Sequence, residues 1–135
     1  MGDNLPGVRV REAILPQFEK WLERKHGSIT FHLTQIITGH GSFGEFREKI
    51  GKSRNAKCFH SLSPRDSAQH TVEVCAAWSM ERQELRRIIT GPLTLKNMIG
   101  EMLKSEEKWN AVRDFASKVM RKKEEEERRR ERENG

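Results

Sequence analysis

The pattern that most constrains the fold lies near the end of the chain, where apolar residues recur at helical spacing and then stop. Between positions 109 and 119 these side chains stand three or four residues apart: Trp109, Val112, Phe115 and Val119. This spacing places them on one face of an α-helix, and that face must pack against other elements. From Arg121 onward almost every residue is charged. We therefore expect a helix that begins at Ser105, contributes to a core up to Met120, and continues as an exposed extension that frays.

The charged segment 121–135 places opposite charges four residues apart. The expected pairs are Glu124–Arg128, Glu125–Arg129 and Glu126–Arg130. Pairs in this orientation each stabilise a helix by roughly 0.2–0.5 kcal/mol. Because Glu and Arg nearly cancel in this segment, it predicts only weak affinity for phosphates by itself.

Shorter helices are predicted upstream from apolar spacing and from residues that start or stop a helix. In residues 15–27, Pro16 suits a first turn and Gly27 a C-terminal stop. The predicted buried positions there are Leu15, Phe18 and Leu22, with Trp21 beside them. Residues 28–41 fit both strand and helix periodicity, and we choose a helix because Gly39 and Gly41 follow it and no partner strand is evident.

Two further segments carry helix N-terminal signals. Ser42 and Glu45 form a capping box ahead of an apolar stripe, and Thr94 is the expected N-cap of the helix that follows Gly91-Pro92. The predicted buried positions of these helices and of the one before Gly91 are Phe43, Phe46, Ile50, Leu85, Ile88, Ile89, Leu95, Met98, Ile99 and Met102. Trp21 and Trp78 are expected in the core.

Charge and composition favour a polyanion as partner. The chain has a formal net charge of +6 and an isoelectric point near 9.6, which indicates nucleic acid first and a membrane surface second. No apolar run approaches the ~18 residues of a transmembrane helix, and no secretory signal is evident. We expect RNA or DNA and no membrane partner. Two cysteines do not form a disulfide scaffold, which favours a reducing compartment, nuclear or cytoplasmic.

Both cysteines lie within residues 58–75, together with two of the five histidines. Cys58, His70 and Cys75 have the spacing of a zinc knuckle, which binds tetrahedral zinc through four thiolate or imidazole ligands. The second cysteine of the usual C-x2-C turn is replaced by Ser61, whose hydroxyl is a poor zinc ligand. Zn²⁺ is therefore a candidate cofactor with one ligand missing.

Several arrangements of this segment stay open from the residues alone. His60 can supply the fourth ligand, or water can complete a three-ligand site. The segment can also keep a knuckle fold without tight metal binding, or hold the cysteines as small buried apolar residues. Asp66 is expected to cap a helix that carries His70, with Gln69 reaching back to it.

The residues around this segment favour nucleic acid. Phe59 follows the first cysteine directly and is a candidate stacking surface for an unpaired base. The candidate phosphate contacts are Lys52, Arg54, Lys57 and Arg65. Core packing of Phe59, and solubility charges without a ligand, are the alternatives. His32 and His40 are interpreted as structural.

Three stretches together resemble a known protein family. "FHLTQIITGHGSF", "DSAQHTVEVC" and "CAAW" followed by Arg82 resemble the C-terminal region of reverse-transcriptase polyproteins of insect non-LTR retrotransposons. The resemblance runs from about Leu15 to the charged tail. In that family this region follows the polymerase and carries a CCHC zinc knuckle, which is implied to bind template RNA or target DNA. The resemblance puts the ligands on Cys58, His70 and Cys75, leaves Ser61 as a departure, and makes His60 a spacer.

These observations predict a mainly α protein: a small helical domain around a degenerate zinc-knuckle loop, with a long charged C-terminal helix. The expected organisation is a loose leader at 1–11, a helical domain at 12–120 and a charged tail at 121–135. We expect a nucleic-acid-binding module or fragment without enzymatic activity, since the acidic pair of a polymerase is not found. The alternatives are a helical interaction module, self-associating through the C-terminal helix, and a non-functional remnant of a decayed element.

Overall fold

A computed structural model describes residues 7–134 of the chain, and within this range it contains helices and loops but no strand. This confirms the predicted mainly α fold. The elements are α1 (Val8–Ile14), η2 (Leu15–Gln17), α2 (Phe18–Glu23), α3 (Phe31–Thr38), α4 (Gly44–Lys49), α5 (Ala68–Glu73), η3 (Ala76–Trp78), α6 (Ser79–Arg86), α7 (Leu95–Met102) and α8 (Glu106–Asn134).

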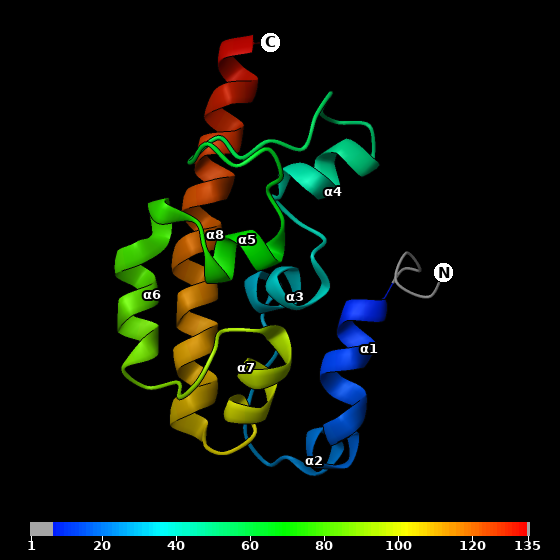
Figure 1. Cartoon of the computed structure of the whole chain (residues 1–135), viewed down its shortest axis with the longest axis vertical. Helices are drawn as coiled ribbons and strands as arrows, with labels where there is room; N and C mark the ends of the chain where they lie inside the picture. The colour runs from blue at the N-terminus through cyan, green and yellow to red at the C-terminus, as the bar shows by residue number, and fades with distance from the viewer. Residues whose placement is uncertain (1–6, 135) are drawn as a thin grey trace.

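Helix α8 is the axis of the molecule, and the other helices are arranged along it (Figure 1). Helices α3, α6 and α7 contact α8 directly, while α1 packs on α7 and α3. The predicted apolar stripe of α8 is buried at every position: Trp109, Val112, Phe115 and Val119. The stripe therefore forms the centre of the core, as its spacing predicts.

The helix-start signals at Thr94 and Ser105 are confirmed. The Thr94 hydroxyl accepts from the Asn97 N–H at 3.2 Å, and the Ser105 hydroxyl accepts from the Lys108 N–H at 3.1 Å. Residues 31–38 form the helix that was chosen over a strand, capped by Thr30. These starts are decided by hydrogen bonds within four residues, which explains why sequence alone locates them.

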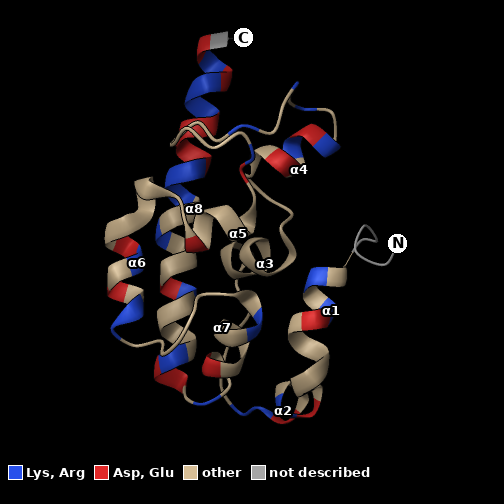
Figure 2. Ribbon diagram, viewed as in Figure 1, with Lys and Arg blue, Asp and Glu red and all other residues tan. Residues whose placement is uncertain are grey.

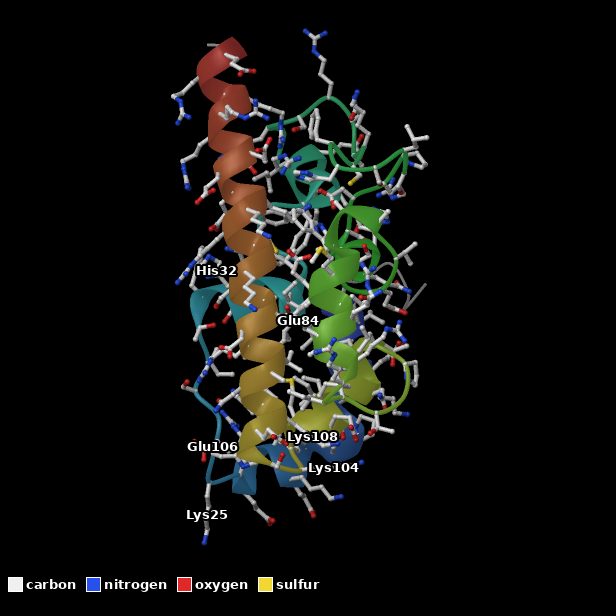
Figure 3. The ribbon with its side chains drawn as sticks, turned by 90° about the vertical axis from the view of Figure 1, so that its left-hand side faces the viewer. Lys25, His32, Glu84, Lys104, Glu106 and Lys108 are labelled. Atoms are coloured by element: carbon white, nitrogen blue, oxygen red, sulfur yellow. The ribbon has the colours of Figure 1, made fainter. Side chains whose placement is uncertain are left out.

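At the N-terminal end of α8, the buried carboxylate of Glu101 joins α7 to α8. Lys104 and Lys108 bind the Glu101 carboxylate at 2.5 and 2.6 Å, and Figure 3 shows both lysines at this end of the helix. These hydrogen bonds, with one from the Thr90 backbone, lower the pKa of Glu101 to about 2. The carboxylate is therefore charged at neutral pH and fixes the α7–α8 turn.

Two predicted N-caps are wrong, because their side chains serve tertiary contacts instead. The N-cap of α4 is Phe43, and the Ser42 hydroxyl donates to Glu127 on α8 at 2.6 Å. The N-cap of α5 is Ser67, whose hydroxyl accepts from the His70 N–H. Asp66, one residue earlier, is buried and binds Lys123.

The N-terminal part of the chain also differs from the prediction. Helix α1 begins at Val8, inside the expected leader, and Arg9 donates to the Ile36 and Ile37 carbonyls of α3 at 3.1 and 2.7 Å. The remainder of the leader, residues 1–6, lies outside the described residues. In residues 15–27 the face predicted to be buried is exposed: Leu15, Phe18 and Leu22. Trp21 instead packs on Trp109, with ring centroids 5.5 Å apart.

The charged tail is not the exposed, fraying extension predicted from sequence. Helix α8 continues to Asn134, and the loop between α4 and α5 lies beside its upper part (Figure 1). Lys123 is only 2% exposed. Glu124, expected to pair with Arg128, instead binds His32 and Gln35 of α3, each at 2.9 Å. One face of the tail is thus part of the tertiary structure.

Candidate functional site

The three predicted ligands come together from two segments of the chain. Cys58 lies in the loop after α4, His70 on α5 and Cys75 just after α5. The atoms that could bind a metal, two Sγ and one imidazole nitrogen, all lie within 4.8 Å of one another. We call these three side chains the donor group, and no other such group is found within residues 7–134. The three side chains are close enough to hold a metal ion.

The spacing of the two thiols suits a small tetrahedral ion. The Cys58 and Cys75 Sγ atoms are 3.9 Å apart, and two sulfurs bound to one zinc at about 2.3 Å would be about 3.8 Å apart. The His60 N–H donates to Cys58 Sγ at 3.4 Å, and a hydrogen bond from the Ala77 backbone reaches the Cys75 thiol. Such N–H donors also stabilise thiolates, which metal binding requires.

Ser61 occupies the fourth side of this group. Its hydroxyl lies 3.2 Å from His70 Nε2 and hydrogen-bonds the Cys75 thiol. The His60 imidazole instead packs on Trp78, with ring centroids 5.0 Å apart, and is not in the donor group. The position usual for the second cysteine therefore faces the site, while the side chain considered as a replacement ligand lies against the core.

The pKa shifts of His70 and Cys75 both favour the neutral form of the side chain before a metal binds. Burial lowers the pKa of His70, with a further lowering by Lys123, so the neutral imidazole that a metal needs is favoured. Burial raises the pKa of the Cys75 thiol, and the neighbouring Cys58 thiol adds to this effect. Metal binding would therefore release protons from the thiols.

Two buried ionic side chains fix the backbone that carries the donors. Arg82 donates to the Thr71, Val72 and Cys75 carbonyls at 2.8–3.1 Å, which ties α6 to the end of α5. On the other side, Asp66 accepts from the Lys123 ammonium at 2.8 and 3.0 Å.

The Asp66 carboxylate also joins α4 to this end of the molecule. It accepts from the Gly44 N–H at 3.0 Å, and the Thr71 hydroxyl donates to it at 3.3 Å. The donor group is therefore held by α4, α6 and α8 together with α5.

Next to the donor group, Phe59 is 47% exposed and surrounded by cations. The Arg130 guanidinium carbon lies 3.8 Å from the Phe59 ring centroid. Lys57 Nζ and the Arg47 guanidinium carbon are 5.5 and 5.8 Å from it. Figure 2 shows the basic residues of upper α8 near the loop that carries Phe59. An aromatic face beside several cations can stack a base and bind its phosphates.

The other predicted nucleic-acid contacts are less concentrated. Lys52 and Phe59 line the same surface cavity, of about 320 Å³, whereas Arg65 is paired with Glu45 at 2.9 Å. Arg54 is exposed. From the sequence, Arg130 is predicted only as a partner of Glu126 and not as a neighbour of Phe59. A uniform run of Glu and Arg does not show which side chain faces another segment.

Comparison of the chain with known proteins gives no match. No family model matches the chain, and no curated protein or solved structure matches it. The described part of the chain has no helix with the length and apolar character needed to cross a bilayer.

Proposed function

We propose that the protein is a nucleic-acid-binding module that takes single-stranded RNA or DNA on the surface formed by Phe59 and its cations. The observation that carries the proposal is the half-exposed Phe59 ring with Arg130, Arg47 and Lys57 around it. Unpaired bases stack on aromatic side chains with little sequence preference, and flanking cations bind the phosphates. The exposed Lys52 and Lys57 would bind phosphates here, because Arg47 is buried and paired with Glu127. The net charge of +6 supports the same ligand class.

Zinc is the metal that we assign to the donor group. Two thiols and an imidazole are the donor set that zinc prefers, and the 3.9 Å separation of the Sγ atoms suits it. Cys58, His70 and Cys75 would hold the ion, which would crosslink the loop to α5. Water or the Ser61 hydroxyl would face the fourth position. The role is structural: it fixes the backbone of Phe59, which directly follows a ligand.

The proposed origin is the C-terminal region of a non-LTR retrotransposon reverse transcriptase, on the strength of the motifs quoted above. This origin implies a four-ligand knuckle, and three of its implied ligands lie close together in the chain. The protein would then bind template RNA or target DNA, while polymerisation would belong to a separate domain. We propose no catalytic role for the chain itself.

The test is a binding titration of fluorescent single-stranded RNA and DNA of about 12 nucleotides, a length within the range that one small domain covers. We expect affinity that falls steeply with salt, with a slope that reports the number of phosphates neutralised. Phe59→Leu should weaken binding by about fivefold or more, because base stacking contributes about 1–3 kcal/mol.

The control is Leu62→Ala, which removes an exposed apolar side chain from the same loop and should leave affinity unchanged. Absence of salt-sensitive binding would refute the proposal. Equal effects of Phe59→Leu and Leu62→Ala would refute the stacking role of Phe59.

The rival proposal is a helical protein that meets a partner or a second copy through the apolar stripe of α8 and the charged tail that continues it. The stripe from Trp109 to Val119 is buried inside the chain and is not available to a partner. Exposed large apolar side chains lie elsewhere on the surface, among them Leu15, Phe18, Leu22, Phe31, Leu62, Val74 and Met80.

A further inference from the structure

One face of the Phe59 ring is already covered by a side chain of the protein. The Arg130 guanidinium carbon is 3.8 Å from the ring centroid, which is direct van der Waals contact. A guanidinium is planar and delocalised and lies on an aromatic face much as a base does. A base inserted between the two would need a separation of about 7 Å, two contact distances. Arg130 and a base therefore compete for this face.

The helix that carries Arg130 is held firmly at this point. Lys123 and Glu127 precede Arg130 by seven and three residues and so lie on the same face of α8. Lys123 binds the buried Asp66, and Glu127 binds Arg47 at 2.8 Å. Access to the ring therefore requires rotation of the Arg130 side chain rather than movement of α8.

The Arg130 guanidinium is partly desolvated where it lies on the ring. Burial and the nearby Arg47 lower the pKa of Arg130 there, against the opposite effect of Glu127 and Glu126. The cavity beside Phe59 is also lined by Lys52, a cation available to a phosphate once a base lies on the ring.

We propose that Arg130 is a built-in competitor for one face of the Phe59 ring, so that an unpaired base stacks on that face only by displacing it. This inference rests on the proposed function and deepens it, since it makes the charged end of α8 a regulator of affinity. The ligand class is a single-stranded polynucleotide with an unstacked base.

The experiment compares Arg130→Ala with Arg132→Ala, a matched variant that loses the same charge from an exposed position on the same helix. Binding of the fluorescent oligonucleotides is measured in both variants at the same salt concentration. We expect Arg130→Ala to bind about two- to fivefold more tightly than Arg132→Ala, the factor that corresponds to losing an exposed cation–π contact. Equal or weaker binding by Arg130→Ala would overturn the proposal.

A second pair of variants ties the effect to the ring. In a Phe59→Leu background the difference between Arg130→Ala and Arg132→Ala should disappear, because there is no aromatic face left to compete for. A difference that persists would show that Arg130 acts elsewhere, and it too would overturn the proposal.

The outcomes separate the two proposals. If the wild-type protein shows no salt-sensitive binding, the proposed function fails and the competitor role fails with it. If the wild-type protein binds and Phe59→Leu weakens binding, while Arg130→Ala matches Arg132→Ala, only the competitor role fails.

Discussion

At the scale of single residues, Ser61 decides how strongly the donor group can hold a metal. Its hydroxyl lies 3.2 Å from His70 Nε2 and contacts the Cys75 thiol, so its side chain already faces the three donors. A serine hydroxyl keeps its proton at neutral pH, whereas a thiol in the same place readily becomes a thiolate ligand. Ser61 therefore lies beside the three donors, and its own hydroxyl does not supply a thiolate.

We predict that Ser61→Cys will bind one zinc ion at least about tenfold more tightly than the wild-type protein, a gain of about 1.4 kcal/mol. The new thiolate completes a tetrahedral set of three sulfurs and one nitrogen. Competition against a chromophoric chelator in reducing buffer gives the affinity, and thermal unfolding with and without zinc gives the linked stability.

Ser53→Cys serves as the control, because it adds a thiol to the same connecting segment at a residue outside the donor group. It should leave zinc affinity unchanged. Equal affinities in Ser61→Cys and the wild-type protein would show that the fourth position does not limit binding.

At the scale of elements, the end of α8 is the clearest difference between prediction and structure. Sequence reasoning located the helix, its apolar stripe and its start at Ser105, all of which depend on local spacing and capping. It did not find that Lys123 is buried against Asp66, because the two residues are 57 positions apart. A run of charged residues has no periodicity that marks its buried face.

We predict that Lys123→Met will destabilise the protein by about 3–5 kcal/mol, because it leaves the buried Asp66 carboxylate without its cation. Lys118→Met is the matched control, since Lys118 and its partner Glu84 are both exposed at the surface. It should cost less than about 1 kcal/mol. Urea denaturation measures both values, and similar losses in the two variants would contradict a buried ion pair at Lys123.

The candidate site, like helix α8, was predicted in its local features but not in its contacts with distant segments. Sequence spacing identified Cys58, His70 and Cys75, which the structure brings together. It could not identify Arg82 or Asp66 as the side chains that hold the site, because their partners lie on other elements. The role of Phe59 stays a prediction.

At the scale of the whole molecule, both ends share α8 as their common support. One end packs Trp109 against Trp21 and Gly27, and the other holds the donor group through Lys123. Figure 3 shows α8 running the length of the molecule with Glu84 of α6 beside it, where Lys118 binds that carboxylate at 3.1 Å. Loss of packing at either end should therefore weaken the entire fold.

We predict a single cooperative unfolding transition, whose midpoint shifts as a whole when a residue at either end of the molecule is substituted. Gly27→Ala should lower stability by about 2–5 kcal/mol, because Gly27 has φ 96° and an added Cβ would collide with the Trp109 ring. Gly51→Ala, at φ 81° but in open space, should cost only about 1–2 kcal/mol.

In each of three proteins, the wild type, Gly27→Ala and Lys123→Met, the unfolding midpoint from far-UV circular dichroism should equal the midpoint from tryptophan fluorescence. The shared midpoint should be lower in the two variants than in the wild type. Two separate transitions in any of them would show that the donor-group end unfolds independently of the end around Trp109.

The sequence by itself determined most of the helices and their boundaries, apart from α1, and the three candidate metal ligands, because helix periodicity, capping and ligand spacing act over a few residues. The tertiary structure decided which faces are buried, why Ser42 and Asp66 do not cap their helices, and which cation covers Phe59. Each of these depends on a partner from a distant segment. Charged side chains in particular can be solvated or paired in the interior, and only the packing of α3, α4 and α5 against α8 selects between these two environments.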